Sequence, residues 1–406
     1  MLLRVFLPFA AGYFLSYLYR VVNAVISADL VSDIDIGPSA LGLLTATYFI
    51  SFASFQLPLG VLLDRFGPRK TESILLLFAA AGAYIFSQAQ GLSGLIVGRA
   101  FIGFGVSACL MAAFKAYTMW FPRDKWPRIN GFQMASGGLG ALAATSPVEF
   151  MLGITDWRTL FLVLSGLTLF VAILVFFVVP EKEGPAKGES LSRQLAGIRE
   201  VFTSMRFWRA APLTTMSQAA FLSIQGLWAG PWLRDVARLD RSESASVLFL
   251  VAIAMIVGFI SLGAIAERLN SRGVPVITTA VAGMGSFLLI QSVLIFGPTA
   301  WAQTIWIFFG FFGTAGIISY AALSGSFPVQ LSGRVTTGIN LLVFVAAFIA
   351  QWAIGVIIEM WPIAPDGSYS AQGYRAGFGL MLVIQVASLC WFFYADRFIK
   401  KDEDIQ

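Results

Sequence analysis

The sequence contains no histidine and only two cysteines, Cys109 and Cys390. Without histidine, the chain has neither an imidazole proton relay nor a histidine-ligated metal centre. The two cysteines lie in different apolar stretches, so they offer no disulfide framework and no cysteine metal site. The residues therefore predict a protein that uses no cofactor and no metal.

Charged residues are scarce as well. They make up 12% of the chain, whereas soluble domains carry about 25%. Hydrophobic residues make up 58%, and the mean hydropathy is +0.79. The sequence has no Gly-x-x-x-x-Gly-Lys-Ser/Thr loop, which excludes ATP as a direct energy source. It also has no nucleophile–base arrangement, so we do not expect an enzyme.

Long apolar runs dominate what is present. Twelve stretches can each cross a hydrocarbon core of ~30 Å, which takes roughly 20 helical residues. They cover residues 5–28, 40–63, 73–91, 93–121, 129–152, 159–179, 207–233, 243–266, 274–297, 300–326, 335–360 and 376–395. The sequence thus predicts an all-α membrane protein with twelve transmembrane helices, embedded in a lipid bilayer.

The basic residues indicate how the chain is oriented. With both termini inside, the outer loops hold few of them: Arg158, Arg234, Arg238, Arg241 and Arg375. Most of the others fall in inner loops, as the positive-inside rule requires. The net charge of +5 then faces an anionic inner leaflet rather than a nucleic acid. We expect a monomer in a bacterial cytoplasmic (inner) membrane, with both termini cytoplasmic.

Two patterns recur about half a chain length apart. GVLLDRFGPRK begins at Gly60 and GAIAERLNSRG begins at Gly263, and each places an acid–arginine pair four residues after its glycine. Phe-Pro followed by arginine also occurs twice, ending at Arg128 and at Arg334. The repeats predict two pseudo-symmetric six-helix bundles, residues 1–180 and 207–406.

The segment between the two bundles is polar. In residues 181–206, the stretch SLSRQLAGIREVF carries apolar residues at helical spacing. It is therefore interpreted as a cytoplasmic linker with a short amphipathic helix on the inner membrane surface. The alternative is a disordered connector.

The sequence resembles the major facilitator superfamily over its whole length. GVLLDRFGPRK looks like the signature loop of that superfamily between helices 2 and 3, and GRAFIGFG, with Arg99, Gly103 and Gly105, looks like its helix 4 motif. Glycines of this kind, also present in the fifth and tenth spans, favour close helix packing. The resemblance implies two bundles that rock about a central site, alternately opening it to each side.

The resemblance also implies a cytoplasmic gate. In it, the Asp64 carboxylate faces the positive N-terminus of the helix that follows Arg334. Arg65, Arg69 and Lys70 offer partners to acids on neighbouring helix ends. The alternative is that these charges only set the topology. The residues assigned to the gate are Gly60, Asp64, Arg65, Gly67, Arg69, Lys70, Glu267, Arg268 and Arg334.

Ionisable residues deep in a span are candidates for function because they are costly to bury. Arg20 shares a helix face with Tyr17 and Asn23, and this segment resembles the helix 1 region of organic-anion symporters. A guanidinium can hold a carboxylate by two parallel hydrogen bonds. Arg20 is therefore predicted to bind substrate, and the alternative is a structural pair with Glu149.

Three further charged residues lie in predicted spans. Lys115 serves either the substrate site or the inner headgroups, which its side chain can reach. Arg99 and Glu149 lie near the outer ends of their spans, where an ion pair is plausible. Glu149 is interpreted as the only carboxylate well inside a span, and a raised pKa there would suit reversible protonation. Glu149 and, by resemblance, Arg99 are therefore assigned to proton coupling, with a purely structural role as the alternative.

The second half has no charged counterparts of these residues. Its polar candidates for substrate binding are Gln225, Trp228, Tyr320 and Gln351, and the helix that holds Gln225 and Trp228 is expected to break at Gly230-Pro231. These side chains either shape selectivity or only hold helices together.

Together these residues predict a secondary active transporter. The leading hypothesis is proton-coupled symport of a small organic anion such as a carboxylate, by alternating access. The alternative is a proton-coupled efflux antiporter for a drug or metabolite, which the aromatic-rich spans of the second half would suit. A sensor that does not transport would be expected to carry an added soluble domain.

Overall fold

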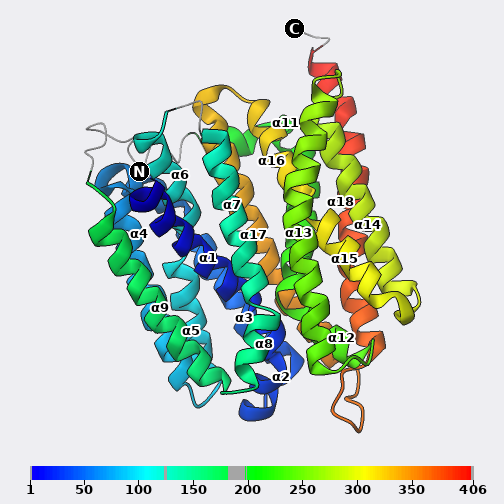
Figure 1. Ribbon diagram of the computed structural model, residues 1–406. Coiled ribbons are helices and arrows are strands. Elements are labelled where there is room, and N and C mark those ends of the chain that lie inside the picture. The colour runs from blue at the N-terminus through cyan, green and yellow to red at the C-terminus, as the bar shows by residue number, and fades with distance from the viewer. Residues whose placement is uncertain (1, 123–125, 182–196, 198, 404–406) are drawn as a thin grey trace. The chain divides into compact units, whose positions relative to one another are not determined.

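The computed structural model describes residues 2–122, 126–181, 197 and 199–403 (Figure 1). This described part contains helices and turns and no strand. It divides into two compact units, Met1–Leu191 and Ser192–Gln406. The predicted amphipathic helix falls mostly on residues 182–196 and 198, outside the described part, so it stays a prediction.

The first unit holds the first six predicted spans. Its elements are η1 (Leu2–Phe6), α1 (Leu7–Val21), α2 (Asn23–Ile34), α3 (Pro38–Ser54), α4 (Gln56–Gln88), α5 (Leu92–Gly105), α6 (Cys109–Trp120), α7 (Trp126–Ala143), α8 (Ser146–Leu152) and α9 (Trp157–Val178). The predicted spans 5–28, 93–121 and 129–152 each contain two helices that follow each other closely. The long helix α4 joins the second and third spans.

The second unit holds the other six spans. Its elements are α11 (Met205–Ser223), η3 (Ile224–Trp228), α12 (Ala229–Asp235), α13 (Arg241–Asn270), α14 (Val276–Phe296), η4 (Thr299–Trp301), α15 (Ala302–Gly313), α16 (Gly316–Gly325), α17 (Val329–Glu359) and α18 (Ala371–Glu403). In the described residues of both units, nine helical segments are long and apolar enough to cross a membrane. The three remaining predicted spans are helical too but are interrupted or more polar, which confirms the all-α membrane fold.

Helix packing repeats from one unit to the other. In the first unit α1 packs against α7, α3 against α5, and α4 against α9. In the second, α11 packs against α17, α13 against α15, and α14 against α18. These are the corresponding helices of each half, counted in chain order. The internal duplication seen in the sequence is therefore also a duplication of packing.

Glycines permit the closest of these approaches. A methyl group at Gly103 would lie 2.9 Å from the Cα of Tyr48, and one at Gly310 would lie 2.6 Å from the carbonyl oxygen of Val251. Both distances are too short for a real Cβ atom. The expected role of these glycines in helix packing is confirmed, because only glycine lets the facing backbones approach so closely.

The signature loop turns at a glycine with positive φ. Gly67 adopts φ 77° and ψ 162°, and Pro68 follows it. Positive φ is costly for any residue with a Cβ atom. Gly67 therefore separates the end of the second span from the start of the third within α4.

The expected break at Gly230-Pro231 is wrong. α12 runs from Ala229 to Asp235 through Pro231, and the irregular stretch is instead the π-helical turn η3, Ile224–Trp228. Pro231 has no N–H, and its ring crowds the carbonyl of the residue four positions earlier, Leu227. The distortion therefore appears one turn before the proline, which is a common position for a π-bulge at a functional segment.

Candidate functional site

The buried Arg20 side chain is surrounded by aromatic rings. It lies at the end of α1 and is only 7% exposed. Its guanidinium carbon lies 4.4 Å from the ring centroid of Tyr17, 5.9 Å from that of Tyr48 and 5.7 Å from that of Phe52. The predicted contact between Arg20 and Tyr17 is present. Cations over aromatic faces are stabilised by the ring quadrupole.

A second buried arginine also lies near the Tyr48 ring. Arg99, on α5, is fully buried, and its guanidinium carbon lies 5.7 Å from the Tyr48 ring centroid. Its Nη1 donates to the backbone carbonyl of Tyr19 at 2.8 Å. Nε and Nη2 of Arg99 are buried and donate to no acceptor among the described residues.

Tyr48 thus connects the two cations. Its hydroxyl donates to the carbonyl of Ser16 at 3.1 Å, which fixes the ring between α1 and α5. We call Tyr17, Arg20, Tyr48, Phe52 and Arg99 the arginine–aromatic cluster. Tyr48 and Phe52 were not singled out from the sequence, although their i, i+4 spacing places both on one face of α3.

Asn23 was predicted to share the Arg20 face. In the structure the helix is interrupted at Val22, between α1 and α2, and Asn23 is fully buried. Its amide nitrogen donates to the Thr45 hydroxyl at 2.9 Å. Asn23 therefore fastens α2 to α3 beside the cluster.

The other charged candidates are less buried. Glu149 is half-buried in the short helix α8, and Lys115 is half-buried in α6. The predicted ion pair between Arg99 and Glu149 is not formed, because within the described residues no carboxylate pairs with Arg99. Glu149 is also not the only carboxylate in a span, since Glu72 lies fully buried in α4.

In the second unit, three of the predicted residues lie close together. Gln225 and Trp228 belong to η3 and Gln351 to α17, and all three are buried. The indole nitrogen of Trp228 donates to the carbonyl of Gln351 at 3.0 Å, and the Gln351 amide donates to the carbonyl of Ser223 at 3.4 Å. Trp228 and Gln351 therefore hold α17 against the π-helical turn.

Tyr320 is half-buried in α16. Of the four neutral candidates, Gln225 is the buried amide whose position on the distorted turn η3 best suits a ligand contact. The irregular backbone of such a turn is tolerated in a membrane where it lines a site.

Two residues assigned to the predicted gate, Arg69 and Lys70, make polar contacts inside the first unit. Nη2 of Arg69 lies 3.2 Å from Oε2 of Glu181, Lys70 pairs with the same carboxylate, and Arg69 also donates to the Val179 carbonyl at 3.3 Å. The hydrogen bond from Lys70 and then the charge of Arg69 lower the pKa of Glu181. The signature loop is therefore tied to the end of α9.

The remaining gate residues make fewer visible contacts. Arg65, Glu267 and Arg268 are exposed, and Arg65 lies over the Phe66 ring at 5.2 Å. Arg334 lies against Gly197 in the second unit. The side chain of Asp64 is outside the part of the chain that the structure describes, so its predicted contact with the helix after Arg334 stays a prediction.

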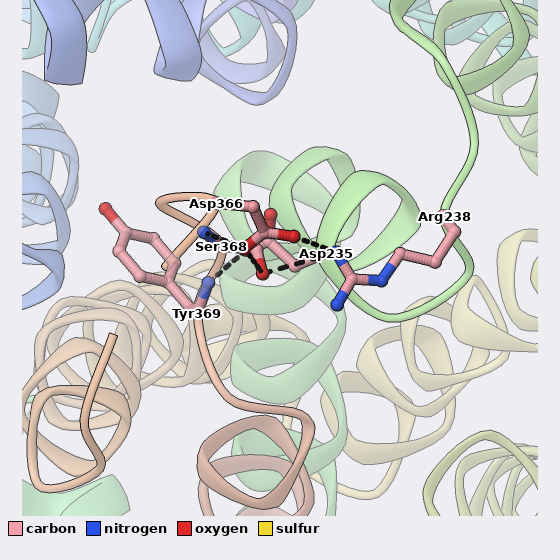
Figure 2. Close-up of polar contacts among 5 residues, drawn as sticks. All are labelled: Asp235, Arg238, Asp366, Ser368 and Tyr369. Atoms are coloured by element: carbon pink, nitrogen blue, oxygen red, sulfur yellow. Dashed lines mark hydrogen bonds and ion pairs between the residues drawn. The ribbon is translucent and has the colours of Figure 1, made fainter. Parts of the chain in front are cut away.

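The second unit also contains a polar cluster at the end of α12, which Figure 2 shows. Arg238 donates to Asp366 at 2.7 Å, and the hydroxyl of Ser368 donates to the same carboxylate at 2.6 Å. The backbone N–H of Tyr369 donates to Asp235 at 3.3 Å. These five residues, called the Asp366 cluster, join the end of α12 to the loop before α18, at the opposite end of α18 from the C-terminus (Figure 1).

The surroundings of the Asp366 cluster shift the pKa values of two of its members, Asp366 and Tyr369. The hydrogen bonds from Ser368, followed by that from Arg238, lower the pKa of Asp366 to about 2. Burial and then the Asp235 carboxylate raise the pKa of Tyr369 to about 12. The sequence gave no sign of this cluster, because Arg238 was counted only as an outer-loop charge.

The sequence is similar to those of known transporters. The chain is 24% identical over 402 residues to a probable sulfoacetate transporter of Cupriavidus necator, covering 93% of this chain and 90% of that protein. It is also 24% identical over 397 residues to a hexuronate transporter of Bacillus subtilis, covering 93% and 92%.

The fold matches a solved structure closely. A bacterial homologue of the human lysosomal transporter Spinster, inward-facing and unoccupied, superposes with a TM-score of 0.79 at 16% identity, over 98% of this chain and 97% of that one. The family model of the Major Facilitator Superfamily matches residues 9–351. The chain belongs to the major facilitator superfamily and is an integral membrane protein, a secondary transporter for a small molecule rather than an enzyme.

Proposed function

We propose that this protein is a proton-coupled symporter for a small organic anion. The observation that carries the proposal is the pair of buried guanidinium groups, Arg20 and Arg99, which lie 5.9 Å and 5.7 Å from the ring centroid of Tyr48. In the described residues, neither ion pair nor carboxylate contact accounts for the charge of Arg99.

The energetics favour an anionic ligand. A buried cation without a counter-ion costs several kcal/mol, and a bound carboxylate or sulfonate would offset much of that cost. The Arg20 and Arg99 side chains supply planar donors that match such oxyanions better than an ammonium would. A cationic drug would instead meet two like charges, so these residues weigh against it as the cargo.

The names of the relatives point the same way. Sulfoacetate carries a sulfonate and a carboxylate, and a hexuronate is a sugar with a carboxylate. We therefore propose a small carboxylate or sulfonate, with a size between that of a two-carbon acid and that of a hexose acid. The neutral donors Gln225, Trp228, Tyr320 and Gln351 of the second unit, and Tyr17, Asn23 and Lys115 of the first, would select among such acids.

Proton coupling would drive uptake. An anion entering a cell against a negative-inside potential must overcome ~2.3 kcal/mol per charge per 100 mV, so cotransport of protons makes its entry electrically feasible. Glu149 and Arg99 are retained as candidates for this coupling. Glu149 is the half-buried carboxylate of α8, and Arg99 is the cation that an anion would neutralise.

In alternating access, the arginine–aromatic cluster would be exposed first to one side of the membrane and then to the other. The signature loop would act as a cytoplasmic latch, with Asp64 holding the closed state and Arg69 and Lys70 anchored to Glu181. We propose a monomer in a bacterial cytoplasmic membrane with both termini inside, the orientation that places most basic loops in the cytoplasm.

Uptake into liposomes that contain the purified protein tests this function. Radiolabelled glucuronate and sulfoacetate are supplied outside while the outside buffer is more acidic than the lumen. We expect accumulation above the external concentration, abolished by a protonophore. Glucose is the matched control, because it resembles glucuronate without the carboxylate and should not accumulate. Downhill entry alone, or export of the anions toward the acidic side, would contradict the proposal.

A further inference from the structure

Glu72 is the most deeply buried carboxylate in the described part of the chain. It lies in α4, five residues after Gly67, and its side chain is completely inaccessible. Both carboxylate oxygens are buried, and neither accepts a hydrogen bond from a described nitrogen or oxygen donor. The surrounding segment, Arg65–Gln88, is long and apolar enough to cross the membrane.

Three helices enclose this carboxylate. On α1, Gly12 provides the necessary space, because a methyl group there would lie 3.5 Å from Cδ of Glu72 and would overlap its Oε1 atom. On α6, the Cys109 thiol is a polar neighbour of the Glu72 carboxylate. Its Sγ atom would lie 3.7 Å from the same methyl group at Gly12. A thiol is only a weak hydrogen-bond donor.

The other titratable groups around Glu72 are engaged elsewhere. Tyr117 of α6 is near enough to interact electrostatically, but its hydroxyl donates to Gln133 at 2.7 Å. Arg69 and Lys70, earlier on α4, are bound to Glu181.

Two cations lie on helices that pack nearby. Arg20 is eight residues beyond Gly12 on α1, about 12 Å along the helix. Arg99 of α5 donates to the Tyr19 carbonyl. Two further charged residues lie on the helices packed on α4: Arg158 at the start of α9 pairs with Asp33, and Lys115 of α6 is half-buried. No cation therefore pairs with Glu72 in the described structure.

Such surroundings suit the neutral acid far better than the carboxylate. An isolated buried carboxylate costs many kcal/mol, and a protein relieves this cost by protonating the group. Water reaching the interface of α1, α4 and α6 would restore the solvation of the ionised form. The occupancy of the proton would then depend on how closely these three helices are packed.

We propose that Glu72 is a proton-binding site of the transport cycle, protonated while α1, α4 and α6 are packed and deprotonated when they separate. The assignment rests on the proposed proton-coupled symport. Since Gly12 and Arg20 lie on the same helix, anion binding at Arg20 and proton binding at Glu72 both act on α1. Movement of α1 links the two ligands without requiring that they touch.

Infrared spectroscopy of the purified protein tests the site without a substrate. A protonated carboxylic acid has a carbonyl stretch that is separate from the amide bands and shifts in heavy water. We expect this signal in the wild type at neutral pH and its loss in Glu72→Gln, whereas the control Glu200→Gln, at an exposed position, keeps it. A wild type without the signal, or a Glu72→Gln variant that retains it, would overturn the proposal.

Transport in liposomes then tests coupling. In Glu72→Gln we expect glucuronate exchange across the membrane to persist at half or more of the wild-type rate. Accumulation driven by a pH gradient should be lost, while the control Glu200→Gln, which changes an exposed carboxylate, accumulates normally. Accumulation that persists in Glu72→Gln overturns the role of Glu72. Wild-type accumulation driven by a sodium gradient instead of a proton gradient also overturns it. If the wild type itself fails to accumulate any tested anion, the proposed function fails, and the infrared result still reports on Glu72.

Discussion

Replacement of Arg20 is the perturbation with the largest expected effect on binding. The side chain is 7% exposed and lies 4.4 Å from the Tyr17 ring. Truncating one partner of a buried charge pair costs ~2–5 kcal/mol. Arg20→Ala should therefore weaken glucuronate or sulfoacetate binding by roughly 30-fold to several thousand-fold.

The Arg20→Lys variant separates charge from geometry. An ammonium keeps the positive charge but loses the planar fork that matches a carboxylate. We expect an affinity between those of the wild type and Arg20→Ala. The stability of Arg20→Ala should change less than its affinity, because loss of a cation–π contact worth ~0.5–2 kcal/mol is offset by relief from burying a charge.

Isothermal titration on folded, detergent-solubilised protein measures these affinities. Arg65→Ala is the matched control, since it removes the same side chain from an exposed position beside an aromatic ring. Its affinity should equal that of the wild type. If Arg20→Ala binds the anions as tightly as the wild type but melts at a lower temperature, Arg20 is a structural residue and the organic-anion reasoning fails.

Three further predictions concern the gate and the framework of the second unit. Asp64→Asn should slow transport at least tenfold with little change in affinity, because a latch controls conformational steps; equal losses in stopped-flow uptake and in titration would contradict a latch. Gln291 and Gln385 exchange two hydrogen bonds of 3.0 Å between α14 and α18. Changing either one to Leu should lower the free energy of unfolding by ~1–3 kcal/mol, and changing both should lower it by less. Additive losses of stability in thermal unfolding would disprove this mutual dependence. Because the folded pKa of Asp366 is lowered to about 2 from an ordinary value of 3.8, the stabilisation from its contacts should be full above 3.8 and disappear as the pH falls toward about 2. The rate of hydrogen exchange in the loop at residues 366–369, corrected for intrinsic rates, should therefore stay constant as the pH falls to 3.8 and increase below it. In Asp366→Asn the exchange should be fast at every pH.

The fold could be predicted because the sequence features that define it lie within short segments and recur in both halves of the chain. Apolar length marks each span, and the basic turns at Gly60 and Gly263 mark corresponding positions of the two halves. The backbone consequences of proline were harder to place. Pro231 distorts the turn before it, since the carbonyl that it disturbs belongs to Leu227, and this displacement is not visible as a break in composition.

The site was only partly predictable, because its polar groups are brought together by packing between helices. Arg20 and Tyr17 share one helix face, so their contact could be expected from spacing. Tyr48 reaches the same cluster from α3, and its neighbours in the sequence give no sign of that. Glu72 falls one residue before the predicted span 73–91, yet the structure buries it completely in α4, five residues after the turn at Gly67.

Proton movement that accompanies anion entry is the central claim, and a dye that reports lumenal pH measures it directly. Liposomes containing the protein and the trapped dye receive glucuronate outside, at equal pH on both sides. Potassium and valinomycin hold the membrane potential near zero. Symport predicts that the lumen acidifies as soon as glucuronate is added, and that the protein with added glucose leaves the dye unchanged. Entry of labelled glucuronate without acidification, or with alkalinisation of the lumen, would contradict proton-coupled symport.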